Sequence, residues 1–166
     1  MELELKKQIL SLAIDRKLSK YQDIYRFGDV MFATNGHAII IMPNDSAISG
    51  YPAFMDRGRL AKLLSILNGS AYKLSLREIQ EMQPFEAFFE EETLHVVNLM
   101  GVLVEYEYID MLKSAMQLSL TSNCIIHLGK PREEIRVVAD KFEMIITPYI
   151  YEAECDTVIQ LQRLHV

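Results

Sequence analysis

The last third of the chain constrains the fold most, because it holds several short strand-like runs joined by tight turns. Turn-forming residues separate these runs, and only one stretch between them has the apolar spacing of a helix. Such a pattern is typical of an antiparallel α+β fold and not of alternating βαβ units. The predicted elements are a strand at 102–106, a helix at 108–116, and strands at 118–120, 124–127, 134–139 and 142–151.

The beginning of the chain shows a similar order of helix and hairpin strands. Asn35-Gly36 is its strongest turn signal, because both residues tolerate the positive φ angles of a tight hairpin turn. Gly28-Asp29 marks a second turn just before it. The predicted elements are an amphipathic helix at 3–18 and strands at 24–27, 30–34 and 37–42.

The middle of the chain contains a second predicted helix, at 56–67, with Asp56 as its N-cap and Asn68-Gly69 as its C-cap. Short strands are predicted on either side of a less regular stretch. Residues 77–93 contain a proline, two adjacent phenylalanines and an acidic run, which indicate an irregular and partly exposed segment. The strands expected here are 72–76 and 93–98. A helix followed by a short antiparallel meander thus recurs three times along the chain, in pattern but not in residue identity.

Composition indicates a globular protein of a reducing compartment. The chain has 166 residues, half of them hydrophobic, and a net charge of −6. It begins with no signal peptide and has no run of about 20 apolar residues, so we expect a cytoplasmic protein with no membrane association. Cys124 and Cys155 do not form a metal-ligand pattern, and we expect one buried and one near-terminal free thiol.

Motifs that would indicate an enzyme are absent from the sequence. It has no phosphate-binding glycine loop, no zinc-protease helix, no nucleophile elbow and no paired-cysteine zinc pattern. The histidines lie far apart, and His37 is best interpreted as the first residue of a strand. We therefore expect no catalytic residues, no cofactor and no metal. An enzyme stays open as an alternative if His37, His95 and His127 converge in one pocket.

Basic residues gather on the first two predicted helices. They could follow a phosphate backbone, provided that charge is segregated on one face of this acidic chain. The ordinary explanation is that they are the solvent-facing charges that any amphipathic helix carries, and this explanation has slightly more weight. The cluster on the second helix is Arg57, Arg59 and Lys62, and the first helix carries Lys6, Lys7, Arg16 and Lys17.

Two stretches resemble the bacterial sliding clamp, the ring-shaped processivity subunit of the replicative DNA polymerase. Residues 31–37, Met-Phe-Ala-Thr-Asn-Gly-His, are similar to a hairpin of sliding clamps that has the sequence ATDGHR. Asn35 stands in place of its Asp, and Ala38 stands in place of its Arg. Residues 104–113 look like the last strand and helix of a clamp, and residues 143–148 resemble its closing strand. Together these stretches and their surroundings cover about half of the chain.

The resemblance implies antiparallel sheets with helices on one face, built from repeated helix-plus-meander units. It implies a helix and hairpin unit at 1–49, a clamp-like domain with two helices at 50–151, and a tail at 152–166. A clamp-like protein would be a non-enzymatic homo-oligomer in DNA replication that holds duplex DNA without reading its sequence. The residues expected to face DNA are Arg57, Arg59, Lys62, Lys6, Lys7, Arg16 and Lys17.

Clamps also bind peptide motifs of replication proteins beside the closing strand, which would here include Ile146, Pro148 and Tyr149. A ring would need more copies of this short chain than the usual two. The alternative is a protein-interaction module that keeps the clamp-like fold without encircling DNA. It would bind partners at an apolar patch, and this binding would not change on removal of Arg57, Arg59 and Lys62.

Overall fold

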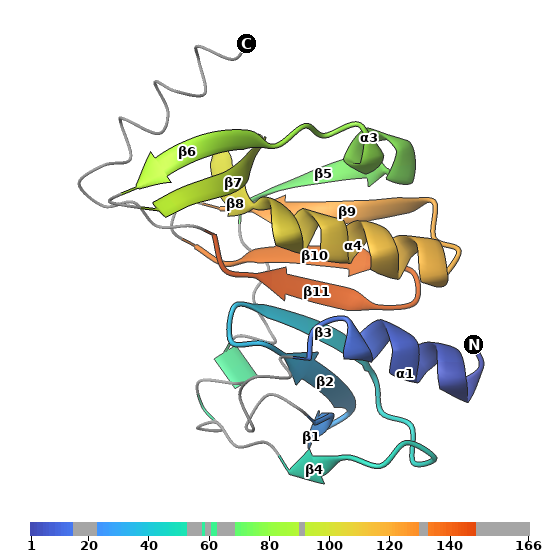
Figure 1. Ribbon diagram of the computed structural model, residues 1–166. Helices are drawn as coiled ribbons and strands as arrows, with labels where there is room; N and C mark the ends of the chain where they lie inside the picture. Colours follow the sequence, from blue (N-terminus) through green and yellow to red (C-terminus); the bar gives the residue numbers. More distant parts are fainter. Residues whose placement is uncertain are drawn as a thin grey trace.

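A computed structural model describes residues 1–14, 23–52, 58, 61–62, 69–89, 92–129 and 133–148 (Figure 1). Its labelled helices are α1 (Leu3–Ser11), α3 (Leu76–Gln80) and α4 (Tyr106–Leu118). Its strands are β1 (Tyr25–Phe27), β2 (Val30–Thr34), β3 (Ala38–Pro43), β4 (Tyr51–Pro52), β5 (Ser70–Ser75), β6 (Phe85–Phe89), β7 (Glu92–Leu99), β8 (Val102–Glu105), β9 (Asn123–Leu128), β10 (Ile135–Ala139) and β11 (Glu143–Ile146).

One large sheet organises the molecule. Its eight strands run in the order β4-β1-β2-β3-β11-β10-β9-β5, and all neighbouring strands are antiparallel except β1 and β4. A helix followed by a three-stranded meander occurs twice in it, as α1 with β1 to β3 and as α4 with β9 to β11 (Figure 1). The two copies meet where β3 pairs with β11, so both halves of the chain share one sheet.

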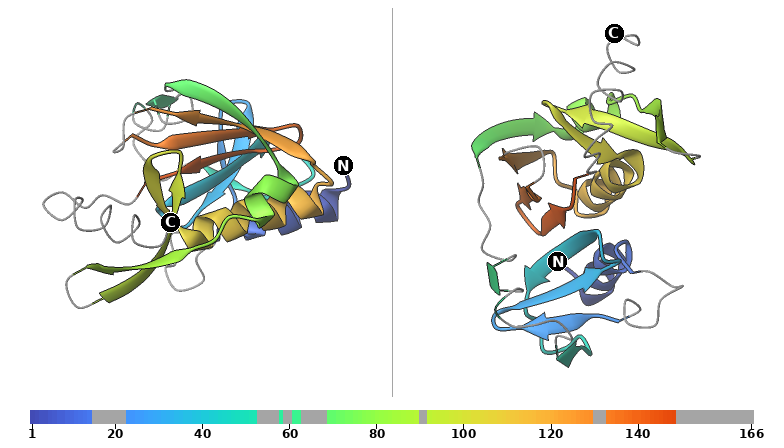
Figure 2. Two further views of the ribbon diagram at one scale, coloured as in Figure 1. Left: turned by 90° about the horizontal axis from the view of Figure 1, so that it is seen from above. Right: turned by 90° about the vertical axis from the view of Figure 1, so that its left-hand side faces the viewer.

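The helices lie on one face of this sheet, and α1 and α4 pack side by side there (Figure 2). A smaller sheet of β6, β7 and β8 packs on α4. The predicted α+β class, with antiparallel sheets and helices on one face, is confirmed.

The turn between β2 and β3 shows why the Asn-Gly signal was informative. Gly36 has a φ of 94°, in the region where a side chain is disfavoured. The Asn35 side-chain oxygen accepts hydrogen bonds from the backbone N–H groups of His37 and Ala38, each at 2.9 Å. This local chemistry fixes the register in which Ala33 lies opposite Ile40.

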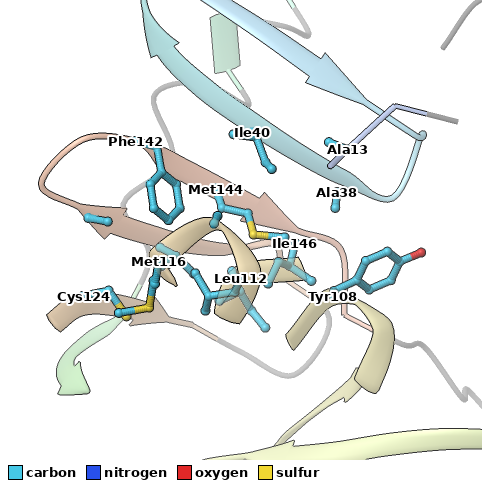
Figure 3. Close-up of a cluster of buried hydrophobic side chains, with 14 of the residues drawn as sticks. Ala13, Ala38, Ile40, Tyr108, Leu112, Met116, Cys124, Phe142, Met144 and Ile146 are labelled. Atoms are coloured by element: carbon cyan, nitrogen blue, oxygen red, sulfur yellow. The ribbon is translucent and has the colours of Figure 1, made fainter. Parts of the chain in front are cut away.

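The main hydrophobic core fills the space between the large sheet and the helices (Figure 3). Ile40 of β3, Met144 of β11 and Leu112 of α4 are almost completely buried in it, so both halves contribute to one core. A second, smaller cluster lies on the opposite face of the same strands, because alternate residues of a strand point to opposite faces. Its buried members are Tyr25, Phe32, Ile39, Ile41 and Ile145.

Residues 77–93 are more regular than the sequence suggested, and that prediction was wrong. Most of them form α3, β6 and the beginning of β7. Helix α3 is short but has a complete capping box. Ser75 accepts a hydrogen bond from the Glu78 N–H, and the Glu78 carboxylate accepts one from the Ser75 N–H, both at 3.1 Å. Glu92, the last residue of the acidic run, is the first residue of β7, whereas Glu90 and Glu91 lie outside the described residues.

The strand predicted at 118–120 was also wrong. Leu118 is the last residue of α4, and the turn that follows contains Leu120 with a φ of 52°. The alternation of Leu-Ser-Leu resembles a strand, but helical packing of the preceding residues decides the local conformation.

The remaining element bounds differ only at their ends. The first helix ends at Ser11, and the closing strand ends at Ile146. Several predicted features lie outside the described residues: residues 15–18 of the predicted first helix, most of the helix at 56–67 with its caps Asp56 and Asn68, and the tail at 152–166. The division at residue 49 stays a prediction.

Candidate nucleic-acid and partner interface

The sequence placed a DNA-facing surface on the first two predicted helices. The first of them is α1, which packs side by side with α4. Each helix buries one face against the sheet, through Ile9 and Leu10 in α1 and through residues such as Leu112 and Met116 in α4. The opposite faces of both helices are polar. Both helices lie on the same side of the large sheet (Figure 2).

Helix α1 supplies two lysines to that layer. Lys6 is half-buried and pairs with Asp45, in the loop after β3, with its Nζ 2.8 Å from the Asp45 carboxylate. The direct hydrogen bond from Lys6 holds the pKa of Asp45 below its ordinary value, and the Ala47 N–H adds to this effect. Lys7 is half-buried. One of the two lysines is therefore already engaged by a carboxylate of the same chain.

Helix α4 offsets the charge of α1. Lys113 pairs with Asp110 at 3.1 Å and lies over the Tyr106 ring, 5.7 Å from its centre. The hydrogen bond to Asp110 raises the pKa of Lys113. With Glu107, α4 carries two acids and one lysine, whereas α1 carries one acid and two lysines. The net charges of −1 and +1 cancel, so the described helix layer is electrically neutral.

The other predicted DNA-facing residues are placed only in part. Lys62 is exposed and helical. Arg57, Arg59, Arg16 and Lys17 lie outside the described residues, so the structure does not bring the predicted set together. The helices α1 and α4 do not supply a basic surface by themselves. Arg57, Arg59, Lys62, Arg16 and Lys17 stay predicted contacts.

The predicted partner groove has two described members, and both are buried. Ile146 has no exposed surface and pairs with Ala38 at the β3–β11 junction. Pro148 is also buried, and Tyr149 lies outside the described residues. Here Ile146 stabilises the core, so the surface of a groove would have to come from neighbouring side chains.

The three histidines named as a possible catalytic group lie on different elements. His37 is exposed at the turn before β3, with its ring 6.4 Å from that of Tyr108. His95 lies on β7 in the small sheet, and His127 lies on β9 of the large sheet. No group of three potential metal ligands occurs in the part of the chain that the structure describes.

The junction of the two halves contains one strongly perturbed side chain. Tyr108 is almost completely buried at the start of α4. Burial raises its pKa first, and the nearby carboxylates of Glu107 and Glu105 raise it further. The phenol therefore stays neutral at physiological pH and acts as a buried contact between α4 and the turn before β3.

Sequence reasoning missed two surface features. A cavity of about 390 Å³ opens beside the β10–β11 turn, and Leu120 protrudes from the turn after α4. No sequence signal marks the cavity, since its walls come from both halves. The turn could have been suspected from Ser119 and Thr121, which favour side-chain to backbone hydrogen bonds. No helix among the described residues is long and apolar enough to cross a membrane.

Repeated helix-plus-meander units, with paired helices on one face of a continuous antiparallel sheet, define a clamp-like fold, and the suspected resemblance is confirmed at that level. The structure is similar to the DNA polymerase III beta subunit of Thermotoga maritima, with a TM-score of 0.58, 9% identity, and coverage of 91% of this chain and 63% of that chain. It is also similar to pol III beta of Caulobacter crescentus, with a TM-score of 0.56, 11% identity, and coverage of 89% and 65%.

These likenesses concern the fold alone, because the identities are so low. The chain spans less than two thirds of either protein. No protein-family model matches the chain, and no curated protein matches it. The clamp-like fold is therefore a divergent and partial one.

Proposed function

We propose that the protein is a non-enzymatic, sliding-clamp-like protein that associates with duplex DNA without reading its sequence. The observation that supports this most is the clamp-like fold itself, with α1 and α4 paired on one face of the continuous sheet. Association with replication proteins, through peptide motifs, and assembly into a homo-oligomer are part of the same proposal. The proposal includes a cytoplasmic location.

Contact with DNA has to overcome the net charge of −6. Since the described helix layer is neutral, the proposal assigns the phosphate contacts chiefly to Arg57, Arg59 and Lys62. Three such contacts give a slope of about −2.7 in log affinity against log salt, so affinity falls about 40-fold between 50 and 200 mM salt. Binding to unrelated duplex sequences is expected to be equal, because phosphate contacts carry no base information.

The test is fluorescence anisotropy of a labelled duplex at low and raised salt. A double variant, Arg57→Glu with Arg59→Glu, should lose at least tenfold in affinity. A matched variant, Lys73→Glu with Arg77→Glu, makes the same change in net charge on β5 and α3 and should lose much less. Equal losses in the two variants would mean that only net charge matters, and absence of binding at low salt would exclude the DNA-associated function.

The neutrality of the described helix layer favours one second candidate, a protein-interaction module that does not encircle DNA. This candidate predicts no retention of duplex DNA but binding of a labelled Gln-Leu-x-Leu-Phe peptide, the type that docks on clamps. Arg57→Glu with Arg59→Glu should leave that peptide binding unchanged. A protein that binds neither the duplex nor the peptide would share only the fold with clamps.

A further inference from the structure

The turn between β2 and β3 contains a chemically labile pair, an asparagine followed by a glycine. In such a pair the glycine nitrogen can attack the asparagine side-chain carbonyl, because the glycine has no side chain to hinder ring closure. Asn35 is half-buried, and Gly36 is exposed at the tip of the turn. The other asparagines among the described residues precede larger residues; they are Asn44, Asn98 and Asn123.

The side-chain carbonyl of Asn35 is polarised by the turn. Its Oδ1 accepts hydrogen bonds from the backbone N–H groups of His37 and Ala38, each at 2.9 Å. Two such donors stabilise the negative charge that develops on a carbonyl oxygen when a nucleophile attacks its carbon. The Asn35 N–H in turn donates to the Ala38 carbonyl at 3.4 Å. The folded hairpin therefore favours the electrophilic half of a ring closure at Asn35.

The attacking nitrogen, in contrast, is engaged by a buried hydroxyl. The Gly36 N–H donates to Thr34 Oγ1 at 3.0 Å. Thr34 gives its own hydroxyl proton to the Ala38 carbonyl at 2.8 Å, so its oxygen acts only as an acceptor toward Gly36. Thr34 is buried, which keeps competing water away from this acceptor. A hydrogen bond to the protonated form of a group disfavours loss of the proton, and an amide nitrogen attacks only after that loss.

We propose that Asn35 is a site of spontaneous covalent modification and that the Thr34 hydroxyl sets the rate of this reaction. In the first step the Gly36 nitrogen loses its proton and bonds to Asn35 Cγ, while the bond from Cγ to Nδ2 breaks and ammonia leaves. The product is a succinimide ring. In the second step one water molecule opens the ring at either carbonyl and gives aspartate or isoaspartate. Water is the only other reactant, so the reaction does not depend on whether the protein binds DNA.

The two products differ in their effect on the hairpin. Aspartate adds one negative charge and accepts the same two N–H bonds more strongly than the amide does. Isoaspartate adds a carbon atom to the main chain between β2 and β3, so the register in which Thr34 lies opposite Ile39 is disturbed. Thr34 is therefore a positioning residue that protects both the charge and the strand register of this hairpin.

The experiment is peptide mapping by mass spectrometry of the full chain, incubated in mildly alkaline buffer with and without urea. In the folded protein Asn35 should react faster than Asn44, Asn98 and Asn123, and it should react faster still in urea, where the turn is absent. Thr34→Val removes the hydroxyl and should raise the folded rate roughly three- to tenfold, the factor that corresponds to one hydrogen bond. Thr34→Ser keeps the hydroxyl and should stay within about twofold of the wild type.

Ile40→Val, on the same hairpin, is the matched control, because it costs about as much stability as the loss of one hydrogen bond but leaves Thr34 in place. It should leave the folded rate of Asn35 unchanged. A Thr34→Val rate no higher than that of the wild type would overturn the proposal, as would an equal increase in Ile40→Val or in Thr34→Ser. If Thr34→Val does not fold, the wild type decides, since equal rates at Asn35 with and without urea would also overturn it.

Discussion

Cys124 illustrates how burial decides the chemistry of one residue. Its side chain is 2% exposed on the inner face of β9 and belongs to the main core. Burial raises the pKa of the thiol to about 11, and the Glu78 carboxylate adds a smaller increase. The thiolate is the reactive form of cysteine, so this group is inert in the folded protein near neutral pH.

A thiol-labelling experiment checks this prediction. In a Cys155→Ser variant, the remaining thiol at pH 8 should react at least a hundredfold more slowly in the folded than in the urea-unfolded chain, because its thiolate fraction is about 0.001 instead of about 0.25. The folded rate should rise about tenfold for each pH unit until pH 11, whereas the unfolded rate levels off above pH 8.5. A folded rate close to the unfolded one would show that Cys124 is accessible.

Single residues also show what the sequence could reveal. Asn35 and Gly36 act within the turn that they occupy, so their effect was predictable from local chemistry. The pairing of Lys6 with Asp45 joins residues 39 positions apart and could not be predicted, since it depends on where the loop after β3 lies. That pairing matters for the candidate site, because it engages one of the lysines assigned to DNA.

Helix α3 shows, at the scale of an element, which features local sequence patterns could predict and which they could not. Its capping box, Ser75 with Glu78, is a recognisable S-x-x-E pattern, and the sequence could have indicated a helix start there. The proline and the acidic run that follow indicated an irregular segment instead. The strand pairing of β6 with β7 is set by the alternation of residues such as Ala87 and Val96, which pack into a small core of their own.

The capping box gives a measurable prediction. Ser75→Ala should lower the free energy of unfolding by about 1 kcal/mol, because the N–H of Glu78 loses its acceptor. The measurement is urea unfolding followed by circular dichroism. Ser46→Ala, at an exposed loop position, is the control and should change stability by less than about 0.5 kcal/mol. No difference between the two variants would mean that the box contributes nothing to stability.

Helix α4 was predicted to within two residues at each end, because its apolar residues recur at helical spacing over three turns. The strand predicted at 118–120, at its C-terminal end, was wrong. The boundary is set by the hydrogen bonds of Ser119 and Thr121 and by Lys141, which is 22 residues away from Ser119 in sequence. Local periodicity finds a helix, but tertiary contacts decide where this one ends.

At the scale of the whole molecule, the pairing of β3 with β11 unites the two helix-plus-meander units. The repeating pattern was visible in the sequence, whereas the pairing of strands at opposite ends of the chain was not. Four residue pairs join the two strands, from Ala38 with Ile146 to Ile41 with Glu143. This junction and the shared core beneath it connect the two units.

We therefore expect one cooperative unfolding transition. Ile40→Ala in the first unit and Leu112→Ala in the second should each lower the free energy of unfolding by about 2–5 kcal/mol, since both side chains are fully buried. Fluorescence and circular dichroism should report the same midpoint in each variant. A second transition that moves in Ile40→Ala only would show instead that residues 1–49 unfold separately.

The β3–β11 junction also sets the order of events during synthesis. Ile41 pairs with Glu143, so β3 obtains its second neighbour only after about a hundred more residues have been made. At about 5–20 residues per second, this delay lasts roughly 5–20 s. During that time β3 presents an unpaired edge of three consecutive isoleucines, a kind of edge that readily pairs with other chains. Newly made chains are therefore most exposed to aggregation, and most in need of a chaperone, before β11 emerges from the ribosome.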